Sequence, residues 1–88
     1  MYYDLKESGK RIRNLRKQYG WTQEKLAEKL GIALNTVSRI EIGHRGISVD
    51  LAIEFALQLN TTLDYIYMGR EPAIYQDENL REILPTRQ

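Results

Sequence analysis

The chain has 88 residues, a net charge of +1, 42% hydrophobic residues and no cysteine. This length predicts one small domain, and without cysteine neither disulfides nor thiolate metal sites can stabilise it. No apolar run approaches the roughly 20 residues that a membrane span needs, and the N-terminal stretch lacks a signal-peptide core, so we expect a cytoplasmic protein without membrane contact.

The small net charge hides an uneven distribution. Residues 1–45 hold ten Lys or Arg against five Asp or Glu, whereas residues 46–88 hold three against seven. A basic half joined to an acidic half is typical of a protein that binds a polyanion on one side. The alternative is that the basic run KRIRNLRK, residues 10–17, is only a solvated helix face.

The first helix is predicted over residues 4–19. Asp4 can accept hydrogen bonds from the first free backbone N–H groups, and Glu7 three residues later makes a capping-box-like pattern. Gly20 ends the helix. The apolar residues at helical spacing predict a buried stripe made of Leu5, Ile12, Leu15 and Tyr19.

The next two helices are joined by a tight connection. One covers residues 23–30, begins after Thr22 and ends at Gly31. Lys25 stands where a capping box needs Glu, so Thr22 caps this helix without a reciprocal partner. The other runs from about residue 34 to 41 and is closed by Gly43.

Two more helices complete an all-α domain. Ser48 caps the fourth, which Asn60 ends in a left-handed conformation, and Thr62 caps the short fifth, which ends at Gly69. We expect residues 1–69 to form the domain and residues 70–88 to form a tail. Within this tail, residues 77–84 could form about two helical turns, too few to be stable without docking on the domain or on a partner.

The third helix separates two kinds of side chain. At about 100° per residue, Val37 and Ile40 fall on one side and are expected to be buried. The opposite arc, which would then be free for contacts with a partner, carries Leu34, Asn35, Ser38 and Arg39.

Residues 21–43, WTQEKLAEKLGIALNTVSRIEIG, resemble the helix-turn-helix of the Cro and lambdoid phage-repressor type, the XRE-like family. The resemblance extends over roughly residues 8–69. Its most specific pieces are Thr22-Gln23-Glu24-x-Leu26-Ala27, the turn glycine Gly31, and Val37-Ser38-x-Ile40-Glu41-x-Gly43. It implies a compact five-helix, lambda-repressor-like fold whose third helix enters the DNA major groove.

In that geometry the outer arc of the third helix would contact bases. Arg39 can bind guanine O6 and N7, Asn35 can bind adenine N6 and N7, Leu34 can pack on a thymine methyl, and Ser38 can serve a base or a phosphate. Three alternatives stay open. Arg39 could contact a phosphate or a group near Glu41, Leu34 could belong to a protein–protein surface, and Asn35 could simply favour the helix start.

The resemblance also implies phosphate contacts and one structural ion pair. Gln23 is the main phosphate-binding candidate, because backbone N–H groups and the helix dipole favour an anion at the start of a helix. Further candidates are Thr22, Thr36, His44 and Arg45, whereas Arg11 and Arg13 could be phosphate contacts or solvated side chains. In this family the positions of Arg16 and Glu41 form a partly buried ion pair.

The chain departs from the family pattern at three positions. Ala33 stands where Ser or Thr usually opens the third helix, so a cap and a phosphate contact are missing. Ile47 replaces a frequent proline, and Asn60 replaces a frequent glycine.

The sequence therefore predicts a sequence-specific transcriptional regulator that binds double-stranded DNA as a homodimer, with repression as the simplest outcome. The alternative is an antitoxin or another interaction module that binds a protein partner through its acidic half. An enzyme is not expected, because no nucleophile–base pair, carboxylate pair or phosphate loop occurs. No metal or cofactor is expected either, since His44 is the only histidine.

Overall fold

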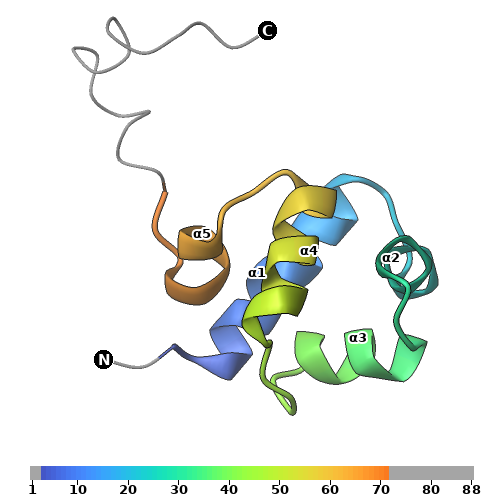
Figure 1. Ribbon diagram of the computed structural model, residues 1–88, viewed down its shortest axis with the longest axis horizontal. Coiled ribbons are helices and arrows are strands. Elements are labelled where there is room, and N and C mark those ends of the chain that lie inside the picture. Colours follow the sequence, from blue (N-terminus) through green and yellow to red (C-terminus); the bar gives the residue numbers. More distant parts are fainter. Residues whose placement is uncertain (1–2, 72–88) are drawn as a thin grey trace, which may run out of the picture.

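The structure, a computed structural model, describes residues 3–71, which form α-helices and no strand (Figure 1). The predicted all-α, five-helix fold is confirmed, and each helix begins and ends within one residue of its predicted limits. The tail helix expected at 77–84 lies outside the described residues. In chain order the helices are α1 (Leu5–Gln18), α2 (Gln23–Leu30), α3 (Leu34–Glu41), α4 (Val49–Leu59) and α5 (Leu63–Met68).

Four of the helices begin at a side-chain cap. Asp4 Oδ1 accepts hydrogen bonds from the backbone N–H groups of the first turn of α1, whereas the carboxylate of Glu7 pairs with Lys10 instead of completing a capping box. The hydroxyls of Thr22, Ser48 and Thr62 cap α2, α4 and α5 in the same way. Helix α3 has Ala33 at its N-cap and no side-chain cap, as the sequence predicts.

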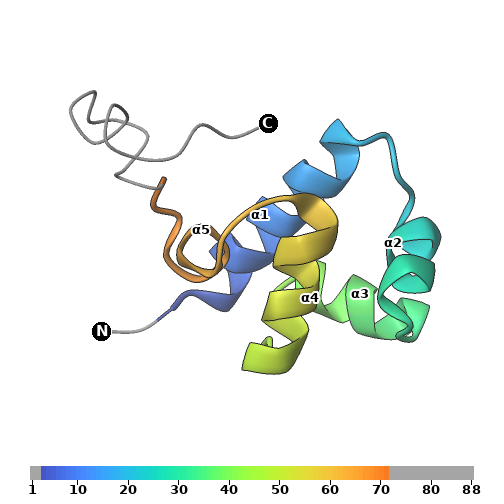
Figure 2. The same ribbon diagram turned by 45° about the horizontal axis from the view of Figure 1, so that its top comes forward.

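The helices pack around one apolar core. Helix α1 contacts α3, α4 and α5, and α2 contacts α3 and α4. Figure 2 shows α4 crossing over α1, with α5 on one side and the α2–α3 pair on the other. The fully buried large side chains come from all five helices: Ile12, Leu26, Val37, Ile40, Phe55, Leu59 and Ile66.

The predicted buried stripe of α1 is partly wrong. Leu5 and Tyr19 are 37% and 44% exposed, whereas Ser8 and Gly9 are buried. Small residues are required there because α3 and α5 approach α1 closely. A Cβ atom on Gly9 would lie 2.3 Å from the carbonyl oxygen of Ile40.

Two side chains of α1 bind the C-terminal end of α5. Ser8 Oγ donates a 2.6 Å hydrogen bond to the carbonyl oxygen of Ile66. The guanidinium of Arg11 donates to the carbonyl oxygens of Ile66 and Tyr67 at 3.2 Å. These carbonyl groups lack partners within α5, so α1 supplies the hydrogen bonds that the end of a helix needs.

Candidate nucleic-acid interface

Helix α3 is held on the core by one side and exposes the other. Val37 and Ile40 are buried, in agreement with the predicted division of this helix. On the opposite side Leu34 is 43% exposed, Asn35 and Arg39 are also exposed, and Ser38 is half-buried. The four predicted base-contacting residues are therefore brought together on one arc of α3.

The predicted phosphate-binding residues come from the start of α2, from α3 and from the loop after α3. Thr22 and Gln23 stand at the start of α2, which packs against α3. Thr36 lies on a half-buried side of α3, away from the outer arc. His44 and Arg45 are exposed in the loop that follows α3.

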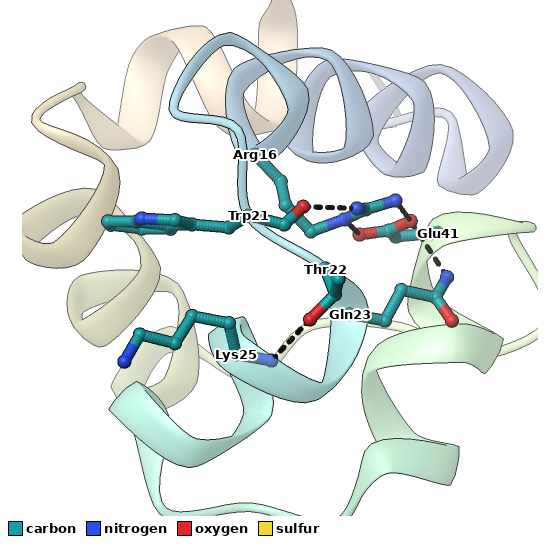
Figure 3. A network of polar contacts seen from close by, with 6 residues as sticks. All are labelled: Arg16, Trp21, Thr22, Gln23, Lys25 and Glu41. Atoms are coloured by element: carbon teal, nitrogen blue, oxygen red, sulfur yellow. Dashed lines mark hydrogen bonds and ion pairs between the residues drawn. The ribbon is translucent and has the colours of Figure 1, made fainter.

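A buried ion pair joins α1 to the C-terminal end of α3. Arg16 Nε and Nη2 donate to the two carboxylate oxygens of Glu41, at 2.7 and 3.0 Å, in a bidentate arrangement (Figure 3). The remaining nitrogen, Nη1, donates a 2.7 Å hydrogen bond to the carbonyl oxygen of Trp21, immediately before α2. Arg16 therefore ties α1 to both helices of the helix-turn-helix.

Gln23 belongs to the same network, which the sequence analysis missed. Its Nε2 donates a 2.9 Å hydrogen bond to Glu41 Oε1. Because a carboxylate only accepts hydrogen bonds, the amide nitrogen must face Glu41, and Figure 3 shows the amide oxygen on the far side. One N–H of the amide is thus committed within the protein, and the other is left for an external acceptor.

The two remaining arginines of α1 differ in environment. Arg13 is exposed, which leaves both of its predicted roles open. Arg11 is not a solvated side chain, because it is half-buried and its guanidinium donates hydrogen bonds to the carbonyl groups at the end of α5. Sequence spacing alone gave no indication of this contact, which joins residues 55 positions apart.

The loop after α3 is fixed by two tyrosines. The backbone N–H of Ile47 donates to Tyr3 Oη, and Tyr67 Oη donates to the carbonyl oxygen of Ile47, both at 2.8 Å. The two rings meet edge to face, 4.8 Å between centroids. Burial and the neighbouring Tyr3 raise the pKa of Tyr67 above its ordinary value of 10.0. The tyrosines thereby hold the end of the loop that carries His44 and Arg45.

Residues 3–71 contain no group of three or more His, Cys, Asp or Glu side chains that could hold a metal ion. No helix among them is long and apolar enough to span a membrane.

Residues 12–66 match the family model HTH_3, described as helix-turn-helix. The chain belongs to this helix-turn-helix family. Its relatives include an uncharacterized HTH-type transcriptional regulator from Archaeoglobus fulgidus, 36% identical over 70 residues, which are 80% of this chain and 91% of that protein. The HTH-type transcriptional regulator ImmR from Bacillus subtilis is 31% identical over 70 residues.

The relatives differ in how much of their length this helix-turn-helix chain matches. The match covers 80% of this chain and 54% of ImmR. A putative HTH-type transcriptional regulatory protein from Pyrococcus furiosus is 44% identical over 45 residues, which are 51% of this chain and 14% of that protein. The shared unit is therefore the helix-turn-helix domain, which other members combine with further sequence.

Solved structures of regulators share this fold. The restriction-modification controller protein C.AhdI from Aeromonas hydrophila superposes with a TM-score of 0.68 at 31% identity, over 73% of this chain and 97% of that one. SinR, a master regulator for biofilm formation solved in complex with DNA, superposes with a TM-score of 0.64 at 28% identity. The superposition covers 67% of this chain and 95% of the SinR chain. The described fold is thus a DNA-binding domain of the transcription-regulator type.

Proposed function

We propose that this helix-turn-helix chain regulates transcription in the cytoplasm by binding a specific double-stranded DNA sequence as a homodimer, with α3 in the major groove. The observation that carries this proposal is the arrangement of α3. Buried Val37 and Ile40 fix its orientation, while Leu34, Asn35 and Arg39 are exposed on its outer side. A major groove about 12 Å wide admits one such helix. The function is binding rather than catalysis.

Base recognition follows from the chemistry of the outer arc. Arg39 offers two parallel N–H donors for guanine O6 and N7, and Asn35 offers one donor and one acceptor for adenine. Leu34 has no polar group and suits a thymine methyl. A correct bidentate contact contributes about 1–3 kcal/mol of discrimination against a wrong base.

Phosphate contacts would fix the position of the domain on the duplex without selecting a sequence. The free amide N–H of Gln23 and the backbone N–H groups at the start of α2 are suited to one phosphate. Arg45 and His44 would meet the backbone beside α3, with Thr22 and Thr36 as further donors. Salt should weaken this part of the binding.

A dimer is proposed because one small module covers little DNA. A single module buries about 600–1,000 Å² on DNA, and a second copy adds a half-site about 34 Å away. Residues 60–88 are the proposed dimer contact, and Leu63, 36% exposed, is an apolar side chain in the described part of this range.

Selection of binding sites from random duplex DNA, with the purified protein at one stated salt concentration, tests the proposal. We expect a palindromic consensus whose half-sites lie one helical turn apart, about 34 Å. A single unrepeated site would contradict dimeric binding. Weak, salt-sensitive binding without a consensus would contradict sequence recognition.

A further inference from the structure

Helix α4 carries a row of exposed apolar side chains. Val49, Ile53 and Leu57 are 61%, 41% and 71% exposed, and they follow one another at intervals of four residues. Residues four apart on a helix lie next to each other on one face. The row therefore forms a continuous apolar strip along the helix, unlike the single exposed apolar residues that are ordinary on protein surfaces.

This strip has no partner in the described chain. The opposite side of α4 packs against α1, α2 and α5 through buried Ala52, Phe55 and Leu59. In both views of the ribbon the outer side of α4 is not crossed by any other element of residues 3–71 (Figures 1 and 2). From Val49 to Leu57 the strip is thus an unpartnered helix face of about 12 Å in length, at about 1.5 Å per residue.

The charged residues of α4 are both negative. Asp50 and Glu54 are exposed and lie one turn apart, next to the strip, and neither has an ion-pair partner among residues 3–71. From residue 46 to residue 69 the sequence contains no Lys or Arg at all. We call the strip with its two carboxylates, Val49, Asp50, Ile53, Glu54 and Leu57, the α4 surface.

We propose that the α4 surface docks an amphipathic basic segment of another protein: a helix whose apolar side covers the strip and whose Lys or Arg residues pair with Asp50 and Glu54. Helices recognise one another in this way through apolar anchors spaced three or four residues apart. Charge complementarity across such an interface selects the partner.

Charge also argues against three other binding partners of the α4 surface: DNA, a second copy of the chain and the chain's own residues 72–88. DNA is a polyanion, and the carboxylates repel it. A second copy of this chain in a two-fold interface presents the same patch to itself, with carboxylates and no basic residue to neutralise them. The chain's own residues 72–88 hold three acidic residues against two arginines, so this segment brings a further negative charge.

The α4 surface contains none of the proposed DNA-contacting residues. These lie on α3, at the start of α2 and in the loop before α4, whereas the α4 surface begins after the cap at Ser48. The two proposed binding surfaces therefore have no residue in common. Docking on the α4 surface adds a protein-binding role to the proposed function and does not depend on it.

The test uses two synthetic amphipathic helical peptides and the full 88-residue chain. One peptide carries a leucine stripe flanked by lysines, and the other has glutamate in place of every lysine. Fluorescence anisotropy measures their binding at low and high salt, and amide chemical shifts locate it on the protein. We expect only the lysine peptide to bind, more weakly at high salt, with shifts concentrated in residues 49–57.

Variants assign the binding to the α4 surface. Leu57→Ser, at the most exposed position of the strip, should weaken peptide binding about tenfold and leave DNA binding unchanged. The double variant Asp50→Asn, Glu54→Gln should also weaken binding and should abolish its salt dependence. Leu34→Ser, which changes a 43% exposed leucine on α3 in the same way, should leave peptide binding unchanged.

Three results would overturn the proposal: equal binding of the two peptides, chemical-shift changes away from α4, or no binding of the lysine peptide. Sedimentation of Leu57→Ser gives a fourth, because conversion of a dimer into a monomer would make the α4 surface the dimer interface. Failure of the wild-type chain to select a DNA sequence would contradict the proposed DNA-binding function and leave these peptide results unaffected.

Discussion

The orientation of α3, the helix proposed to enter the major groove, depends on one buried carboxylate. Glu41 sits at the last residue of α3 and accepts hydrogen bonds from Arg16 of α1 and Gln23 of α2. A buried ion pair contributes little net stability compared with apolar residues of the same size, but breaking it leaves a charge stranded. The value of this pair is therefore geometric, since it fixes three helices relative to one another.

Glu41→Ala should lower the free energy of unfolding by about 3–5 kcal/mol, because it strands the buried guanidinium of Arg16. Urea unfolding followed by circular dichroism measures this loss. The control is Glu7→Ala, which breaks the exposed pair with Lys10 and should cost less than about 1 kcal/mol. Similar losses in the two variants would show that the buried pair has no special role.

Arg39→Ala should relax base preference at one position of each half-site, because the bidentate donor to guanine is lost. Site selection with the variant measures the preference. Arg13→Ala, which removes an exposed arginine of α1, is the matched control and should leave the selected sequence unchanged. Uniformly weaker binding of Arg39→Ala with an unchanged sequence would make Arg39 a phosphate contact.

Local chemistry predicts individual residues only where their role is local. The division of α3 into buried Val37 and Ile40 and an exposed arc follows from helical periodicity, and the structure confirms it. The bond from Gln23 to Glu41 and the contact of Arg11 with α5 join residues 18 and 55 positions apart. Such contacts depend on how the helices cross, and the crossing cannot be predicted from the apolar periodicity of a single helix.

At the scale of elements, the ends of a helix can be predicted from its own sequence, whereas its buried face depends on the helices that pack against it. Helix ends were predicted closely, because a cap such as Thr22 or a left-handed residue such as Asn60 acts on its own turn. The buried face of α1 was predicted only in part. Ser8 and Gly9 are buried because α5 and α3 approach them, although neither residue is hydrophobic.

Gly9→Ala should destabilise the fold although alanine favours a helix. The change gains about 0.5–1 kcal/mol of helix propensity, but the new Cβ would lie 2.3 Å from the carbonyl oxygen of Ile40, so backbone must move. We expect a net loss of about 1–3 kcal/mol in thermal or urea unfolding. Asn14→Ala on the exposed side of α1 should be neutral or stabilising, and an equal response at both positions would contradict the close crossing of α1 and α3.

Tyr67→Phe should cost about 1 kcal/mol at neutral pH, because the hydrogen bond to the carbonyl oxygen of Ile47 is lost. It should also change the alkaline response. Since the pKa of Tyr67 is raised in the folded state, the unfolded chain loses this proton first, and stability falls as the pH rises above 10.0. Unfolding measured from pH 8 to 11 should therefore decline less steeply in Tyr67→Phe, and an unchanged slope would contradict the raised pKa.

At the scale of the whole molecule, the charge asymmetry along the sequence becomes a difference between elements. The helices α1, α2 and α3 carry nine Lys or Arg residues, whereas α4 and α5 carry none. The proposed DNA contacts belong to the first group and the α4 surface to the second. A net charge of +1 is therefore compatible with a basic DNA-binding side, because α1, α2 and α3 hold nine basic residues against four acidic ones, and the other eight acidic residues lie outside these helices.

Deletion of residues 71–88 tests whether this segment contributes to the dimer contact. The deletion removes no residue of the five helices, so the circular dichroism spectrum should remain helical. If the segment contributes to the dimer contact, sedimentation of the truncated chain should show a monomer. Binding to a two-fold site should then weaken by at least about tenfold. Two unlinked monomers bind the half-sites independently, whereas in a dimer the binding of one half-site brings the second domain to the other. A truncated chain that remains dimeric would place the dimer contact within residues 1–70, with Leu63 of α5 as the next position to change.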